Sequence, residues 1–205
     1  MSVRPLVLAS GSSARASVLR AAGIEFVVDR PDVDERAHDE LLLSHGPGAL
    51  AVHLARLKLE TVAGRHPDSL VLAADQVGVL GDGDQVTMLV QQPTFDGAVG
   101  QLLTMSGTTH LLVNGLVLLD TLTGRETIGT DLQTVTMRTY ERAAAEAYVR
   151  RFEPYESAGS YRLEDQERMA PEDRLLDGVA GEDPTGVLGL PLPLFLRMLE
   201  EVSSP

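Results

Sequence analysis

The chain opens on an apolar run that passes through a hydroxyl-rich turn into a helical stretch. Residues 6–9 read Leu-Val-Leu-Ala, residues 10–13 read Ser-Gly-Ser-Ser, and residues 14–22 have the spacing of an amphipathic helix. A helix N-terminus gathers unpaired N–H groups and about half a positive charge, so a Ser/Gly turn followed by Arg15 is able to hold a phosphate. The same pattern is typical of an ordinary serine cap, and both interpretations stay open here.

Strand-like and helical segments alternate along the rest of the chain. The predicted strands are 6–9, 25–28, 70–74, 109–120 and 127–139, and the predicted helices are 14–22, 47–65, 98–105, 140–152 and 194–202. This alternation favours an α/β fold. With 205 residues, 43% of them hydrophobic, the chain can bury the core of a single domain over residues 1–205, and any division into two lobes is expected near residue 90.

Charge and residue usage exclude several classes of partner. Thirty acidic against 17 basic residues give a net charge of -13, which repels nucleic-acid backbones, so no nucleic-acid partner is expected. The chain has no cysteine, no export leader and no run of about 18 apolar residues, so we expect a cytoplasmic protein without a membrane partner. An anionic ligand would need a divalent cation and a local basic pocket to overcome the negative charge.

Several polar residues stand at positions suited to chemistry. Asp75 directly follows the apolar run 70–74, which places it at the carboxyl end of a buried strand, where open α/β sheets bind ligands. A base or metal ligand and a simple turn cap are both open for it. Glu35 belongs to an acidic pair with Asp34 that also fits a solvated loop. Lys58 lies on the polar side of a predicted helix, which favours a solvent-facing side chain.

Other motifs narrow the chemistry. Surface loops are expected at 81–84 and over the acidic stretch 164–173, and a turn is expected at 106–110 with His110 packed or hydrogen-bonded. The absence of HExxH, G-x-S-x-G and P-loop motifs argues against a zinc hydrolase, an α/β-hydrolase and a P-loop NTPase. Carboxylate-plus-metal chemistry on a phosphate remains, in which a metal neutralises the polyphosphate and a carboxylate orients or deprotonates water.

Short fragments spread over nearly the whole chain occur in a familiar order. They are Leu8–Ser12 with Arg15 and Leu19, Val33–Glu35, Lys58, Ala74–Val77, Ser106–Gly107, Gly115, Ala158–Tyr161, Gly181–Pro184 and Gly189–Leu192. In this order the fragments resemble the Maf proteins, which are nucleoside triphosphate pyrophosphatases. A small-molecule binding protein of an unrelated α/β type would explain the ordered set less well.

The resemblance implies a two-lobed Maf-like fold with a mixed central sheet, flanking helices and a cleft between lobes. It also implies Mg²⁺ or Mn²⁺ as cofactor, a homodimer, and cleavage of a nucleoside triphosphate between the α and β phosphates to a nucleoside monophosphate and pyrophosphate. In the same terms Asp75 is the catalytic residue, and Glu35 and Asp75 hold the metal. The implied substrate-binding residues are Ser10, Ser12, Ala14, Arg15, Lys58, Gln76 and Glu164.

Two of these residues resemble one branch of the family in particular. The glutamine at position 76 and the glutamate at position 164 resemble the residues of the 7-methyl-GTP pyrophosphatase branch. The resemblance therefore implies 7-methyl-GTP or another modified nucleotide as the substrate. A carboxylate at Glu164 can accept hydrogen bonds from the N1–H and amino edge of guanine. Four positions depart from the pattern: Ala16 replaces a second arginine, Gln92 replaces a lysine, Ser13 replaces a proline, and Ala14 replaces an aromatic residue that suits a cationic base.

These departures keep an alternative open, namely a weakly active or inactive nucleotide-binding relative with a regulatory role of the septum-formation type. A further basic side chain at the site would favour the enzyme. Arg20, Arg56 and Arg162 are the candidates, and each would have to lie close to Arg15 and Asp75.

Overall fold

The computed structural model describes residues 4–81 and 86–203. Its strands are β1 (Leu6–Ala9), β2 (Val27–Asp29), β3 (Leu70–Leu80), β4 (Thr87–Leu89), β5 (Thr109–Asp120), β6 (Glu126–Met137) and β7 (Leu176–Ala180). Its helices are α1 (Ser13–Ala21), α2 (Leu41–Ala63), α3 (Phe95–Met105), α4 (Arg142–Phe152), α5 (Leu163–Glu167) and α6 (Leu192–Ser203), and 3-10 turns are η1 (Glu35–His38), η3 (Ala158–Ser160), η4 (Pro171–Asp173) and η5 (Pro184–Gly186). Over these residues, no helix is long and apolar enough to span a bilayer.

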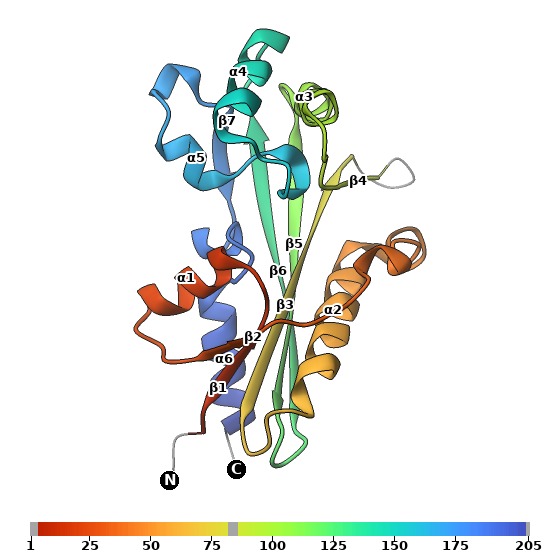
Figure 1. Cartoon of the computed structure of the whole chain (residues 1–205), viewed down its shortest axis with the longest axis vertical. Coiled ribbons are helices and arrows are strands. Elements are labelled where there is room, and N and C mark those ends of the chain that lie inside the picture. Colours follow the sequence, from red (N-terminus) through yellow and green to blue (C-terminus); the bar gives the residue numbers. More distant parts are fainter. Residues whose placement is uncertain (1–3, 82–85, 204–205) are drawn as a thin grey trace. The chain divides into compact units, whose positions relative to one another are not determined.

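The strands form a mixed sheet (Figure 1). Its order is β2-β1-β3-β5-β6-β7, with β4 paired to β3. β1 runs parallel to β2 and β3, whereas β4 is antiparallel to β3 and β7 is antiparallel to β6. The α/β class with a mixed central sheet and flanking helices is therefore confirmed.

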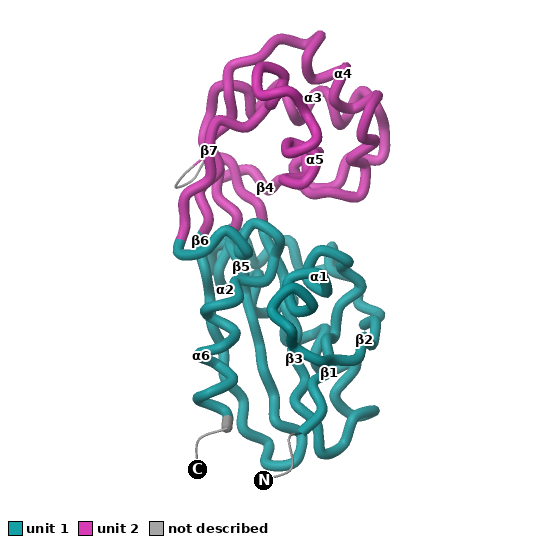
Figure 2. Tube along the Cα trace, turned by 90° about the vertical axis from the view of Figure 1, so that its left-hand side faces the viewer, with its two compact units in different colours: residues 1–77, 113–132, 182–205 teal, residues 78–112, 133–181 magenta. Residues whose placement is uncertain are grey.

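The chain divides into two compact units (Figure 2). Unit 1 comprises residues 1–77, 113–132 and 182–205, and unit 2 comprises residues 78–112 and 133–181. β3, β5 and β6 contribute residues to both units, so three of the four crossings between the units lie within strands, and the fourth lies after β7, between residues 181 and 182.

In unit 1 both faces of the sheet are buried, and successive residues of a strand alternate between them. Leu6 and Leu8 of β1 pack in one core cluster with residues of α1 and α6, whereas Val7 and Ala9 pack in a second cluster with residues of α2. This explains why β1 and the first part of β3 read as continuous apolar runs. Figure 1 shows α2 on the side of the strands opposite to α1 and α6.

Gly115 sets how closely α2 approaches β5. A Cβ atom at this position would lie 2.4 Å from the backbone of Ala51 and of Val52. Because backbone atoms cannot move aside as a flexible side chain can, only glycine fits this contact. A glycine is therefore required at position 115 so that α2, the helix that carries Lys58, can pack against β5.

Unit 2 is built around the packing of α3 on α4. His110 of β5 is buried, and its Nε2 lies 2.8 Å from the hydroxyl of Tyr161. Burial lowers the pKa of His110 to about 4, so the ring is neutral at pH 7. The expectation of a packed, hydrogen-bonded histidine is confirmed.

Two local predictions are wrong. β3 does not end at residue 74 but continues to Leu80, because Val77 and Val79 keep the strand buried beyond Asp75. The acidic stretch 164–173 is not a plain surface loop: it contains part of α5 and η4, and Asp165 is buried. Of the loop predicted at 81–84, residues 82–84 lie outside the described residues.

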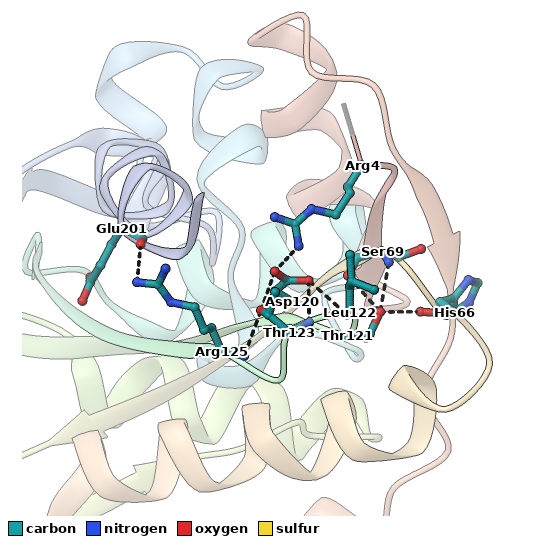
Figure 3. A network of polar contacts seen from close by, with 9 residues as sticks. All are labelled: Arg4, His66, Ser69, Asp120, Thr121, Leu122, Thr123, Arg125 and Glu201. Atoms are coloured by element: carbon teal, nitrogen blue, oxygen red, sulfur yellow. Dashed lines mark hydrogen bonds and ion pairs between the residues drawn. The ribbon is translucent and has the colours of Figure 1, made fainter. Parts of the chain in front are cut away.

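The turn between β5 and β6 is organised by a buried carboxylate (Figure 3). Asp120 accepts hydrogen bonds from the backbone N–H of Leu122 at 3.0 Å and from the Thr123 hydroxyl at 2.6 Å, and it forms an ion pair with Arg4. Burial alone would raise the pKa of Asp120, but these donors lower it to about 2. The carboxylate therefore favours the folded state when it is ionised.

Replacing Asp120 by asparagine is expected to lower the free energy of unfolding at pH 7 by about 2 kcal/mol, because a charge-assisted network is lost. The folded pKa lies below the unfolded value, so this stabilisation is present above about pH 4 and is lost as the pH falls toward 2. Urea unfolding at several pH values measures the gap between wild type and variant. Asp39→Asn, at a weak surface pair with Arg36, serves as the control and should change stability by less than about 0.5 kcal/mol; a gap that does not narrow in acid would contradict the assignment.

Candidate active site

The hydroxyl turn ahead of α1 is a folded structure with its own hydrogen bonds. Ser12 is the N-cap of α1, and its hydroxyl accepts from the N–H of Arg15 at 3.3 Å. The hydroxyl of Ser10, which is buried, accepts from the N–H of Ser12 at 3.2 Å and from Nη1 of Arg15 at 3.2 Å. The side chain of Arg15 therefore folds back over the turn.

Arg15 is held from the other end of the chain. Its Nε donates to the carbonyl of Gly189 at 3.0 Å. Burial lowers the pKa of Arg15, while Asp75 and Glu35 raise it, and the guanidinium keeps its charge because arginine is not deprotonated in proteins. Gly189 has a φ of +82°, and a Cβ there would lie 3.1 Å from Nε of Arg15. Only glycine combines this backbone conformation with so close an approach.

Replacing Gly189 by alanine is expected to displace Arg15 and to lower kcat/KM for a nucleotide about tenfold, because a misplaced phosphate-binding group loses orientation. Gly124→Ala is the matched control, since Gly124 has a φ of +75° and a Cβ there would meet no atom within 4 Å. Both variants should lose about 1 to 2 kcal/mol of stability through the left-handed backbone. Steady-state kinetics beside thermal unfolding separates the two effects, and equal kinetics in both variants would contradict the role of Gly189.

Asp75 lies two residues beyond the end of the parallel β1–β3 ladder, whose last pair is Ala9 with Ala73. It is therefore at the carboxyl end of that pairing although β3 itself runs on. Its side chain is buried and pairs with the ammonium of Lys58. Burial raises the pKa of Asp75, Lys58 and Arg15 lower it, and Glu35 raises it, with a net result above the ordinary value of 3.8.

The prediction of a solvent-facing Lys58 is wrong. Lys58 is 6% exposed and lies on the buried stripe of α2, three or four residues from Leu54, Ala55 and Val62. Its Nζ contacts both Asp75 and, at 2.7 Å, Glu35. The carboxylates compensate the charge, which is why a lysine can occupy this position.

Glu35 begins η1, and its side chain is 49% exposed. The η1 turn is tied to α2 a second time, because Nδ1 of His38 lies 3.0 Å from Nε2 of His53. Glu35 thus reaches Lys58 from a short turn that α2 holds in place.

The carboxylates fit a hard divalent cation. Asp75 and Glu35 meet at one positive group, and Mg²⁺ is usually bound by one or two carboxylates together with substrate phosphates and water. Over residues 4–81 and 86–203, no group of three or more His, Cys, Asp or Glu side chains is placed to hold a metal. The remaining ligands would therefore come from the substrate and from water.

Gln76 supports the loop that holds Arg15. Its amide nitrogen donates to the carbonyl of Gly186 at 2.9 Å and to Oδ1 of Asn114 at 3.1 Å. The fully buried Asn114 donates in turn to Asp131 at 2.9 Å and to the same Gly186 carbonyl at 2.9 Å. Asn114, Asp131 and the 186–189 loop were not among the predicted site residues, and the polar Asn114 inside an apolar strand was the available signal.

The structure brings together Ser10, Arg15, Lys58, Asp75 and Glu35 in unit 1. The Ser12 hydroxyl caps α1 by accepting from the N–H of Arg15. Ala14 is half-buried on α1 and has no side chain that could stack on a nucleotide base. Glu164 is exposed on α5 in unit 2.

The positions that depart from the family have ordinary surroundings. Ala16 is buried in a core cluster of unit 1, and the Gln92 amide in unit 2 lies 3.5 Å from Gln101. Of the arginines considered as replacements, Arg20 lies over the ring of Phe26 and Arg56 pairs with Glu126. Arg162 pairs with Asp165 in unit 2.

The protein is a mixed α/β protein whose site joins a hydroxyl-rich turn to one buried carboxylate, one half-exposed carboxylate and two cationic side chains. A family model described as "Maf-like protein" matches residues 5–202. The chain belongs to the Maf family.

Similar proteins cover almost the whole chain. A 7-methyl-GTP pyrophosphatase of Pseudomonas fluorescens strain Pf-5 is 36% identical over an alignment of 208 positions, which covers 98% of this chain and 99% of that protein. A 7-methyl-GTP pyrophosphatase of Cupriavidus metallidurans strain CH34 is 37% identical over 201 residues, 98% of this chain and 94% of that protein. The crystal structure of a nucleoside-triphosphatase / dITP/XTP pyrophosphatase from Mycobacterium abscessus covers 65% of this chain and 74% of that chain at 11% identity, with a TM-score of 0.37, too low to carry an argument.

Proposed function

We propose that this protein is a metal-dependent nucleoside triphosphate pyrophosphatase that cleaves between the α and β phosphates. The observation that carries the proposal is the buried Lys58 ammonium in contact with both Asp75 and Glu35, with Arg15 acting on the same carboxylates. Relatives of nearly equal length that are named 7-methyl-GTP pyrophosphatases support it. They favour the enzyme over the alternative of an inactive regulatory relative.

In this proposal Asp75 is the general base. It takes a proton from water while the water oxygen bonds to phosphorus at the α–β bridge, and the bridging P–O bond breaks to release nucleoside monophosphate and pyrophosphate. The raised pKa of Asp75 suits this task, since it makes the carboxylate more basic than an exposed one. Arg15 and Lys58 bind phosphate oxygens and offset the negative charge of the chain.

Asp75 and Glu35 would hold the divalent cation. When bound there, Mg²⁺ or Mn²⁺ supplies charge neutralisation and polarisation of the phosphates. Ser10 and Ser12 keep the turn in shape beneath Arg15, as their hydrogen bonds indicate.

The proposed substrate is 7-methyl-GTP, because the similar proteins are named 7-methyl-GTP pyrophosphatases. Glu164 is proposed to accept from the guanine edge, and Gln76 to offer its amide oxygen, because its amide nitrogen already donates to Asn114 and to the carbonyl of Gly186. The proposal includes a cytoplasmic homodimer, which the family resemblance implies and which agrees with the prevalence of symmetric dimers.

The test is release of pyrophosphate from 7-methyl-GTP, GTP, dTTP, UTP and CTP, each with Mg²⁺, with Mn²⁺ and with a chelator. We expect turnover that requires metal and is fastest with 7-methyl-GTP. Nucleotide binding without pyrophosphate release from any of the five would overturn the enzyme and leave the regulatory relative. Faster release from dTTP or UTP would retain the enzyme and overturn the choice of base.

A further inference from the structure

Unit 2 contains a cavity of about 280 Å³ that no residue of the candidate active site lines. It lies between the segment that follows β6, one side of α4 and the segment 169–175. All three segments belong to unit 2, in which Figure 2 shows α4 and α5. Its volume lies just below the range of roughly 300 to 1,000 Å³ typical of drug-sized ligands, so it suits a smaller molecule.

Small and aromatic side chains shape the cavity. Ala144 and Ala147, one turn apart on α4, leave room on an exposed side of that helix. Tyr148 closes the cavity from below, because it is only 1% exposed and its hydroxyl donates to Asp165 at 2.8 Å and accepts from the N–H of Arg162 at 3.0 Å. The Tyr140 hydroxyl is likewise engaged with the carbonyl of residue 102 at 2.7 Å. A ligand would therefore meet the ring of the half-buried Tyr140 here rather than a free hydroxyl group.

Two arginines hold the segment 168–175 in place beside α4. Nη1 of Arg138 donates to the carbonyl of Pro171 at 2.6 Å, and Nη2 of Arg151 donates to the carbonyl of Arg168 at 2.9 Å. Each guanidinium has five N–H groups, so these bonds leave donors on both side chains. The cavity is pre-formed by these contacts, which lowers the entropy lost when a ligand binds.

A third arginine of the cavity, Arg174, has a buried N–H group without a hydrogen-bond acceptor among the described residues. Nε of Arg174 is buried, and no described residue accepts a hydrogen bond from it. Guanidinium nitrogens only donate, so this atom needs an acceptor. Glu172 and Asp173 also line the cavity, and with three arginines the lining carries a net positive charge in a chain whose total is -13.

We propose that this cavity is a second binding site, for a small organic anion that carries a flat ring. The carboxylate or phosphate group would accept from Arg174, and the ring would lie against Tyr140. This site is independent of the proposed pyrophosphatase activity, because it shares no residue with Asp75, Lys58 and Arg15.

The test uses phenyl phosphate and benzoate as probes in titration calorimetry with the full chain. Inorganic phosphate has the anionic group without the ring, and phenol has the ring without the anionic group. Each should bind at least tenfold more weakly than the two probes. Arg174→Gln removes the cationic donor and Ala147→Leu fills the cavity from an exposed position, so each should weaken the ring-bearing anions at least tenfold. Arg142→Gln changes an arginine of the same helix outside the cavity and should leave binding unchanged.

A competing site at Arg15 is separated by one more variant. Binding that survives in Arg15→Gln and is lost in Ala147→Leu supports the cavity in unit 2. Binding that is lost in Arg15→Gln but equal to wild type in Arg174→Gln and Ala147→Leu would overturn the proposal, as would no binding of either probe. Thermal unfolding of each variant verifies that it is folded. If Arg174→Gln does not fold, the result for Ala147→Leu decides the test.

Discussion

The Asp75→Asn variant is expected to release pyrophosphate about 10³-fold more slowly than the wild type, because the group that accepts the proton of water is lost. Asparagine has nearly the same shape and keeps an oxygen for Lys58, so the fold and nucleotide binding should persist. Asp32→Asn, at an exposed position of unit 1, is the matched control and should keep full activity. A variant that retains more than a tenth of the wild-type rate would exclude Asp75 as the base.

The pH profile gives an independent check on the same residue. The base must be ionised to act, so the rate should fall on the acid side as the pH passes down through the pKa of Asp75. Because burial raises this pKa in the metal-free protein, the acid limb of kcat/KM, which reports the free enzyme, should lie above the ordinary value of 3.8. An acid limb below that value would contradict the assignment.

The Lys58→Met variant is expected to lose both activity and stability. Removing one partner of a buried pair leaves an uncompensated charge, here on Asp75, and typically costs about 3 to 5 kcal/mol. Activity should fall about 10²-fold or more, since a cation that stabilises developing charge is missing. The stability deficit should shrink as the pH falls, because a protonated Asp75 no longer needs a cation. Urea unfolding between pH 5 and 8 measures it, and a deficit below about 1 kcal/mol would show that the pair is not coupled as the contacts indicate.

Metal binding should distinguish this variant further. In the wild type the lysine ammonium occupies the place where Asp75 and Glu35 meet, so a divalent cation must compete with it. Mg²⁺ should therefore raise the Tm of Lys58→Met more than the Tm of the wild type. The double variant Lys58→Met, Glu35→Gln should lose this gain. An equal rise in all three proteins would place the metal elsewhere.

Features of this fold that depend on residues close together in the sequence were predictable. The cap at Ser12 and the alternation of strands and helices are local, and so is the apolar run that ends at Asp75. The buried position of Lys58 was not predictable, because it depends on which face of α2 meets the sheet. The contact between Arg15 and Gly189 joins residues 174 positions apart. No local pattern indicates such a pair, although the ordered family fragments contained both residues.

Lys58 is also the only lysine of the chain, which otherwise uses 16 arginines for its positive charge. Amine-directed reagents consequently have one internal target, and in the folded protein that target is covered by two carboxylates. Reductive methylation with a ¹³C label would give a single side-chain signal, apart from the α-amino group, whose reactivity and shift report directly on the occupancy of the site. A residue buried for charge compensation thus doubles as a built-in spectroscopic probe of ligand entry.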